Sequence, residues 1–215
     1  MRAVISGLYA LTPSLLDSDE LVARVRAAIA GGASAIQYRN KIASPPLKRA
    51  QALALRDLCA DSTVRFIVND DVRLAYAVDA DGVHLGREDT AIASARRQLG
   101  PAAIIGASCY DSLERAGEAV EAGADYIAFG SFYASTVKPE APRVKPSLLT
   151  AAKARWNVAV VAIGGITPAR AAPLITAGAD ALAVITAVFE ASDVEAAARA
   201  FAEAFAAPTL VAPRT

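Results

Sequence analysis

Eight short apolar segments alternate with longer alanine-rich segments along the 215 residues of the chain, and this alternation predicts an α/β fold. Each longer segment carries apolar residues at spacings of three and four, as in an amphipathic helix. Eight strand–helix units in a chain of this length predict one TIM-type (β/α)8 barrel. An open doubly wound sheet is the alternative, but no GxGxxG motif follows the first strand.

The predicted strands all end where polar or small residues begin. They are GLYALT (7–12), AIQYR (35–39), RFIVN (65–69), GVHLG (82–86), IIGAS (104–108), YIAFGSF (126–132), VAVVAIGG (158–165) and ALAVITAV (181–188). We expect the barrel to be a single domain over residues 1–206. Residues 207–215 contain two prolines and no periodicity, which predicts a flexible C-terminal tail.

A weak repeat lies between four of the helices and the strands that follow them. It reads GAS at 32–34, DAD at 79–81 and GAD at both 123–125 and 178–180. Glycine at a helix C-terminus adopts the left-handed conformation without strain. We therefore interpret the repeat as structural.

Composition and charge exclude several classes of function. The chain has 22 basic and 22 acidic residues and no block of like charge, so it lacks the clustered positive charge of a nucleic-acid-binding protein. No apolar run reaches the roughly 20 residues of a membrane helix, and the N-terminus lacks a secretory signal. Cys59 and Cys109 fit no metal-binding spacing. We expect a cytoplasmic protein that binds small molecules and contacts no membrane.

Polar residues gather just after the predicted strands, where the chemistry of such barrels takes place. The stretch FIVNDD (66–71) is the clearest case, because burying its carboxylates would cost several kcal/mol, roughly, without a partner. Alternation along the second strand should place Gln37, Arg39 and Lys41 on one face.

The strand ends also predict two anion sites. Gly164 and Gly165 after the seventh strand, with Thr186 after the eighth, are typical of a barrel phosphate site. Three further cations, Arg39, Lys41 and Lys138, indicate a second and more highly charged anion such as a diphosphate.

Two carboxylates near these cations predict a metal ion. Asp70 and Asp89 would repel the second anion unless Mg²⁺ lay between them, completed by phosphate oxygens and water. Structural alternatives remain open here. Asp70 or Asp71 could equally cap a helix, and Asp89 could cap the helix expected near Ala91. The lone His84 is more typical of a hydrogen-bonded core or rim residue than of a base.

These residues resemble those of the thiamine phosphate synthase family, and the resemblance covers nearly the whole chain. Its motifs are, in order, LYALT, IQYRNK, VNDD, ADGVHLGREDT, IGASC, DYIAFGSFYASTVKP, AIGGIT and ADALAVITAV. The resemblance implies a TIM barrel that joins hydroxymethylpyrimidine diphosphate to thiazole phosphate and releases diphosphate. It also implies a dissociative reaction in which diphosphate leaves before the thiazole nitrogen attacks.

The resemblance further implies roles for particular residues. Those matching the pyrimidine diphosphate site are Gln37, Arg39, Lys41, Asn69, Ser108 and Lys138. Those matching the thiazole phosphate site are Ser135, Thr136, Val137, Gly165, Ile185 and Thr186. Asp70 and Asp89 match the Mg²⁺ ligands.

The chain departs from the family pattern at three positions. Val137 stands where the family usually has threonine, which removes a hydroxyl group. Thr186 replaces a common serine and keeps the hydroxyl, and Tyr38 replaces the usual leucine and should point away from Arg39 and Lys41.

Two alternative functions are considered. A related thiazole tautomerase would need a histidine base on a late loop, and FYASTVK contains none. A barrel that binds the ligands without catalysis is the other alternative, and Val137 is the residue that favours it. The sequence leaves open whether the protein forms homo-oligomers.

Overall fold

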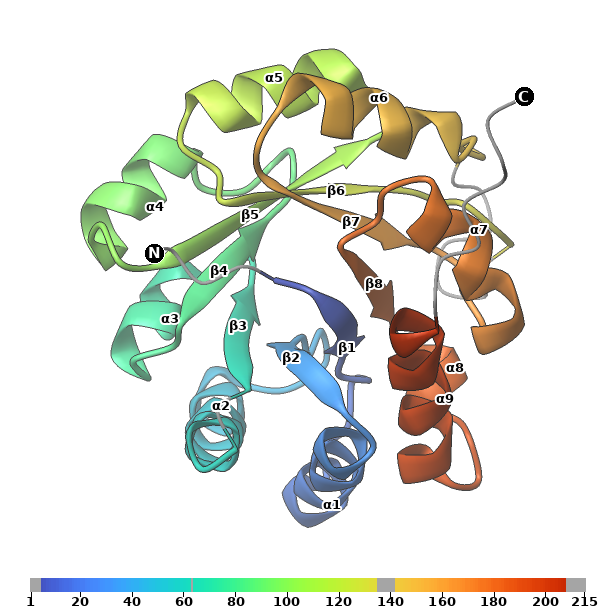
Figure 1. Ribbon diagram of the computed structural model, residues 1–215. Helices are drawn as coiled ribbons and strands as arrows, with labels where there is room; N and C mark the ends of the chain where they lie inside the picture. Colours follow the sequence, from blue (N-terminus) through green and yellow to red (C-terminus); the bar gives the residue numbers. More distant parts are fainter. Residues whose placement is uncertain (1–4, 63, 135–141, 208–215) are drawn as a thin grey trace.

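The computed structural model describes residues 5–62, 64–134 and 142–207, in which eight parallel strands close into a barrel in the order β1 to β8 (Figure 1). The strands are β1 (Gly7–Leu11), β2 (Ala33–Tyr38), β3 (Arg65–Asn69), β4 (Gly82–Leu85), β5 (Ile104–Tyr110), β6 (Tyr126–Phe129), β7 (Ala159–Ile163) and β8 (Ala181–Val184). The predicted barrel is confirmed.

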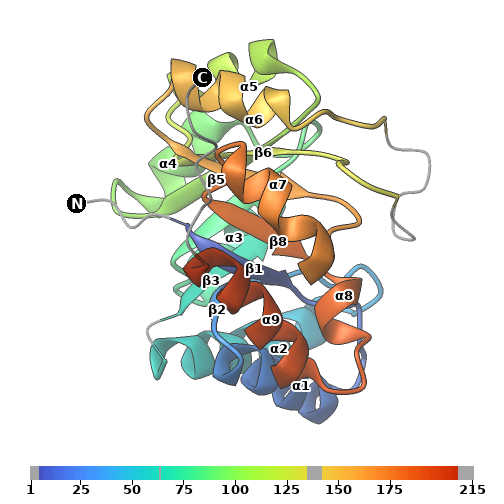
Figure 2. The same cartoon turned by 45° about the vertical axis from the view of Figure 1, so that its right-hand side comes forward.

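The helices surround this barrel, as the turned view also shows (Figure 2). They are α1 (Ser18–Ala30), α2 (Pro45–Ala60), α3 (Val72–Ala77), α4 (Ile92–Leu99), α5 (Leu113–Glu121), α6 (Ser147–Arg155), α7 (Ala171–Thr176), α8 (Thr186–Phe189) and α9 (Val194–Ala206), with the short 3-10 helix η1 (Pro168–Arg170) before α7. No helix in the described ranges is long and apolar enough to cross a membrane. Residues 208–215 of the predicted tail lie outside the described residues, so the proposed boundary stays a prediction.

Three strands end two or more residues before their predicted ends. β6 ends at Phe129 rather than residue 132, and β7 ends at Ile163 because Gly164 and Gly165 turn the chain with φ of 107° and 61°. The predicted strand at 181–188 is wrong in its second half, where α8 begins at Thr186. Apolar residues continue past these strand ends, and an apolar run alone does not distinguish a strand from a short helix.

The barrel interior is filled by a few large side chains set among small ones. Tyr9 and Tyr126 are almost fully buried there, and alanines such as Ala35, Ala159 and Ala181 occupy neighbouring inward positions. The ring of Tyr126 passes over Gly106, where a Cβ atom would come within 1.9 Å of the Tyr126 ring. The tyrosines therefore fit because neighbouring strands offer almost no side-chain volume.

The four-fold repeat lies at the end of the barrel opposite the strand C-termini, and its structural role is confirmed. Its first positions are left-handed, at Gly32, Asp79, Gly123 and Gly178. The aspartates of three repeats each accept a hydrogen bond from the backbone amide of the second residue of the preceding strand. The distances are 2.8 Å for Asp81 and Phe66, 2.9 Å for Asp125 and Ile105, and 2.7 Å for Asp180 and Val160. Each aspartate also pairs with a basic side chain, respectively Arg65, Arg96 and Lys153. These contacts fix the register of the strands.

Loss of the most buried of these carboxylates should destabilise the barrel. The Asp125 and Arg96 side chains are only 5% and 19% exposed, so Asp125→Ala leaves a buried guanidinium and the Ile105 amide without this partner. We expect a loss of about 3–5 kcal/mol in unfolding free energy, measured by chemical denaturation. The matched variant Asp180→Ala, whose ion pair is 29% and 37% exposed, should cost roughly 1–2 kcal/mol. Equal losses in the two variants would contradict this account.

Candidate active site

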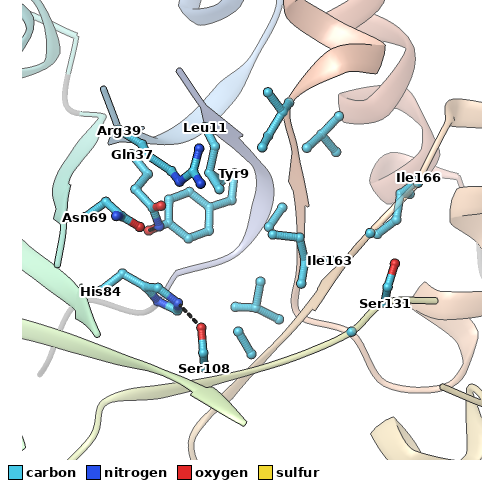
Figure 3. Close-up of a pocket in the computed structure, with 18 of the residues that line it drawn as sticks. Tyr9, Leu11, Gln37, Arg39, Asn69, His84, Ser108, Ser131, Ile163 and Ile166 are labelled. Atoms are coloured by element: carbon cyan, nitrogen blue, oxygen red, sulfur yellow. Dashed lines mark hydrogen bonds between the residues drawn. The ribbon is translucent and has the colours of Figure 1, made fainter. Parts of the chain in front are cut away.

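A cavity of about 590 Å³ opens at the C-terminal ends of the strands (Figure 3). Seven of the predicted site residues line it: Gln37, Arg39, Asn69, Ser108, Gly165, Ile185 and Thr186. They come from the ends of several different strands, which only a closed barrel brings to one place. Its walls also include apolar side chains that the sequence did not single out, among them Leu11, Val161, Ile163 and Ile166.

One side of the cavity is built from tight backbone turns. A side chain at Gly165 would place a Cβ atom 2.1 Å from the carbonyl oxygen of Ala134, so the close approach requires glycine. Ile185 directly precedes α8, and the amides of Thr186 and Ala187 have no partner within that helix because they belong to its first turn. Thr186 lines the cavity, and unpaired first-turn amides of this kind are suited to bind a phosphate group.

The opposite side adjoins a smaller cavity of about 280 Å³, and Arg39 and Asn69 line both. Lys41 and Asp70 line the smaller one. The predicted alternation holds for Gln37 and Arg39 but does not extend to Lys41, because β2 ends at Tyr38. Arg39 and Asn69 thus separate a mostly apolar compartment from a charged one.

Tyr38 points away from this region, as predicted. Its hydroxyl donates to Gln51 Oε1 at 2.9 Å in the layer between β2 and α2. Burial raises the pKa of Tyr38 to about 12, so the hydroxyl stays protonated.

The two carboxylates at the end of FIVNDD, Asp70 and Asp71, have different structural roles. Asp71 is the N-cap of α3 and accepts the Leu74 amide at 2.9 Å, which settles the alternative that the sequence left open. Asp70 adopts a left-handed conformation with φ of 64°. This conformation costs roughly 1–3 kcal/mol outside glycine, although aspartate tolerates it better than most residues, and it is typical of functional sites.

Asp89 does not cap the following helix. Its carboxylate accepts the Gly86 amide at 2.5 Å, whereas α4 begins after Ala91 with no side-chain cap. It also lies close enough to Asp70 to raise the pKa of that residue. Two carboxyl groups from neighbouring strand ends therefore meet beside the smaller cavity.

The meeting of these carboxylates changes the acidity of Asp70. Burial, the hydrogen bond with Asp89 and the Asp89 charge raise the pKa of Asp70 from 3.8 to about 6, while Asn69 and Arg39 act in the opposite direction. Two adjacent carboxyl groups that resist joint ionisation form a site that a cation would stabilise.

The donor set fits Mg²⁺. Asp70 and Asp89 supply hard oxygen ligands, and no group of three or more histidine, cysteine or acidic residues in the described ranges forms a closed metal cage. Mg²⁺ characteristically binds through one or two carboxylates and keeps positions for water and phosphate oxygens.

A chain of buried polar side chains forms the floor of the cavity. Gln37, Tyr9, Tyr126, His84 and Ser108 are joined in this order by hydrogen bonds, and Figure 3 shows the last of these bonds. His84 is 9% exposed, which confirms its predicted place as a hydrogen-bonded core residue. Sequence reasoning missed Tyr9 and Tyr126, although both occupy inward positions of apolar strands.

Tyr110 is another cavity residue that the sequence did not indicate. It ends β5 in a left-handed conformation with φ of 56°, which is unusual for a bulky residue. The guanidinium groups of Arg87 and Arg115 each lie 5.5 Å from the centre of its ring. These contacts hold an aromatic side chain at the mouth beside Gly86.

Four predicted site residues lie outside the described residues. They are Ser135, Thr136, Val137 and Lys138. Ser131 and Pro142, which flank that segment in the described part, both line the cavity.

Fold and site together define a TIM-barrel protein whose mouth is suited to phosphorylated small molecules. The family model described as thiamine monophosphate synthase matches residues 8–188. Two relatives named thiamine-phosphate synthase, from Thiobacillus denitrificans and Methylobacillus flagellatus, are each 54% identical, covering 96% and 94% of this chain and 98% and 96% of their own lengths. A solved thiamine phosphate pyrophosphorylase from Pyrococcus furiosus superposes with a TM-score of 0.84 at 38% identity, covering 93% of this chain and 95% of that one. The chain belongs to the thiamine monophosphate synthase family, as the motifs predicted.

The raised pKa of Asp70 predicts a pH-dependent stability in the metal-free protein. Because the folded pKa lies above the unfolded one, the Asp70 contribution is present below about pH 4 and is lost as the pH rises through about 6. In chelator, Asp70→Asn should therefore unfold at higher denaturant concentration than the wild type at pH 8, by about 1 kcal/mol after allowance for solvent screening. The advantage should vanish at pH 4.

Asp71→Asn is the matched control, since asparagine also caps helices well. It should show no comparable gain at pH 8. A gain in this control equal to that of Asp70→Asn would assign the effect to general charge reduction.

Proposed function

We propose that this chain is a Mg²⁺-dependent thiamine phosphate synthase. It couples hydroxymethylpyrimidine diphosphate with thiazole phosphate and gives thiamine phosphate and diphosphate. The observation that carries the proposal is the single cavity of about 590 Å³ that brings Gln37, Asn69 and Ser108 together with Gly165 and Thr186. Family membership supports the same activity.

The two substrates occupy opposite sides of this cavity. Thiazole phosphate is held with its phosphate against Gly165, Ile185 and Thr186, where backbone amides receive the anion. The pyrimidine ring lies over the polar floor near Gln37 and Ser108. The apolar walls exclude water from the reacting rings. Because both substrates are held in one cavity, they react within a single complex and need no further encounter in solution.

The diphosphate extends toward the smaller cavity. Arg39 and Lys41 face it from the end of β2, and Lys138 is proposed to join them. Mg²⁺ bound by Asp70 and Asp89 would neutralise charge on the leaving group. These fixed cations favour departure of diphosphate, in keeping with a dissociative reaction in which the aminopyrimidine stabilises the resulting cation before the thiazole nitrogen attacks.

Such a reaction requires no protein nucleophile, and the described groups fit this requirement. Cys109 is buried and donates to the Ala107 carbonyl, and burial raises its thiol pKa to about 12. His84, the only histidine of the sequence, is engaged in the cavity floor. A tautomerase would need a general base at the thiazole side, and no described histidine lies there.

One further expectation remains a proposal. We propose a cytoplasmic location, which agrees with two free cysteines, both buried. Whether the chain forms a homo-oligomer stays open, as it was in the sequence.

Removal of a metal ligand or of a diphosphate cation should abolish most turnover. Asp70→Ala and Lys138→Ala should each lower the coupling rate by about 10²-fold or more, because charge on the leaving group loses a fixed partner. The rate is measured as thiamine phosphate formed with Mg²⁺ and with chelator, detected as its fluorescent oxidation product. The controls Asp193→Asn, at the N-cap of α9, and Lys145→Ala alter charged residues of the same type that line neither cavity and should keep near-wild-type rates.

Each result of this assay has a definite meaning. Product that forms only with Mg²⁺ supports the synthase and its metal ligands. Near-wild-type rates in Asp70→Ala or Lys138→Ala would contradict the site assignment. Ligand binding by folded protein without product would favour the non-catalytic alternative.

Val137 provides a milder test of the same site. If the hydroxyl group usual in the family contributes to phosphate binding, Val137→Thr should bind thiazole phosphate about tenfold more tightly, equivalent to roughly 1.4 kcal/mol. Isothermal titration measures the affinity. Unchanged affinity would mean that the backbone is sufficient at this position.

A further inference from the structure

The buried polar side chains on the cavity floor form one continuous hydrogen-bonded chain, called here the polar chain. Gln37 Nε2 lies 2.7 Å from the Tyr9 hydroxyl, which lies 2.8 Å from the Tyr126 hydroxyl. The Tyr126 hydroxyl lies 2.9 Å from His84 Nδ1, and His84 Nε2 lies 2.9 Å from Ser108 Oγ. The chain crosses the barrel from β2 to β5 by way of β1, β6 and β4.

The geometry allows one continuous set of bond directions that begins at the first member of the polar chain. Gln37 Nε2 can only donate, so the Tyr9 oxygen accepts; in this set of directions the Tyr9 proton goes to Tyr126, although the distance alone is compatible with either hydroxyl as donor. In the same set, Tyr126 accepts from Tyr9 and donates to His84 Nδ1. His84 Nδ1 is then unprotonated, the proton of the neutral ring is on Nε2, and that group donates to Ser108 Oγ.

We propose that the polar chain is a polarised unit in which Tyr9, Tyr126 and His84 act as positioning residues that fix which atoms of Gln37 and Ser108 accept and donate hydrogen bonds toward the substrate. In this arrangement Gln37 presents its Oε1 acceptor to the cavity. Ser108 accepts from His84, so its own proton is directed to a ligand.

Packing keeps the two tyrosines in place and protonated. Their rings meet edge to face with centres 6.0 Å apart, and the His84 ring stacks on Tyr126 at 5.5 Å. Burial raises the pKa of both hydroxyl groups well above the ordinary value, so neither loses its proton at physiological pH. Because each hydroxyl keeps its proton, the hydrogen-bond directions of the polar chain can reverse only if all of its protons shift together.

The polarity determines which pyrimidine the site prefers, an inference that rests on the proposed function. An acceptor at Gln37 and a donor at Ser108 match a ring that carries an amino group and an unprotonated ring nitrogen. An oxopyrimidine presents a carbonyl oxygen in place of the amino group and leaves Gln37 Oε1 facing another acceptor. A buried polar group without its partner costs about 1–3 kcal/mol, so the site should discriminate against the oxo compound.

The first test is the state of the imidazole ring, which requires no substrate. His84 is the only histidine of the chain, so ¹⁵N-labelled protein gives one pair of ring nitrogen signals. At a pH where the ring is neutral, we expect Nε2 to carry the proton in the wild type. In Gln37→Glu the carboxylate can only accept, so the polar chain should reverse and the proton should move to Nδ1.

A double variant shows whether the signal passes through the tyrosines. When Gln37→Glu is combined with Tyr9→Phe, the hydroxyl that connects the introduced carboxylate to Tyr126 is absent, and the shift to the Nδ1 form should disappear. Tyr38→Phe removes a buried tyrosine hydroxyl outside the polar chain and should leave both ¹⁵N signals unchanged. Protonation at Nδ1 in the wild type, or no change in folded Gln37→Glu at a pH where its carboxyl group is ionised, would overturn the proposal.

The second test concerns selectivity. The wild type should be inhibited more weakly by the oxopyrimidine diphosphate than by an unreactive aminopyrimidine analogue, and Tyr126→Phe should reduce this ratio of inhibition constants about tenfold. An unchanged ratio in folded Tyr126→Phe would overturn the positioning role. If the wild type bound neither compound, the proposed function would fail, whereas the ¹⁵N result would stand on its own.

Discussion

The hydrogen bond between the hydroxyl groups of Tyr9 and Tyr126 is the contact on which the interior of this barrel depends. It joins opposite walls, from β1 and β6, at a level where neighbouring strands contribute alanine and glycine. The two rings fill space that the small residues leave, and their hydroxyl groups satisfy each other in the buried interior. Because both ends of the polar chain reach predicted substrate-binding residues, the same contact that fills the core also supports the cavity floor.

The two ends of the barrel are built on opposite principles. At the N-terminal ends of the strands, carboxylates of the repeat bind backbone amides and basic side chains, so their charges are neutralised within the protein. At the C-terminal ends, Asp70 and Asp89 face each other, and this proximity raises the pKa of Asp70. The contacts at the N-terminal ends hold the strands in register. The C-terminal ends can therefore keep carboxylates and cations available for a ligand.

The fold and much of the candidate site could be predicted from the sequence because both depend on where apolar runs stop. Gln37, Asn69, Ser108, Gly165 and Thr186 lie around one cavity since strand ends converge in a closed barrel. The pattern could not decide between Asp70 and Asp71 as the helix cap, because either side chain can perform it and only the left-handed backbone at Asp70 selects one. It also missed Tyr9 and Tyr126, since alternation predicts the face of a side chain and gives no information about its partner across the barrel.

Tyr9 and Tyr126 also close the inner end of the cavity. Ile5, Ile67 and Ile104 belong to the same buried interior cluster as the tyrosines, so the route through the barrel is closed. Everything that enters must leave through the same opening. Under the proposed function, a pyrimidine ring held against Gln37 and Ser108 would be covered by the substrate bound nearer the opening, so the pyrimidine substrate would have to bind first.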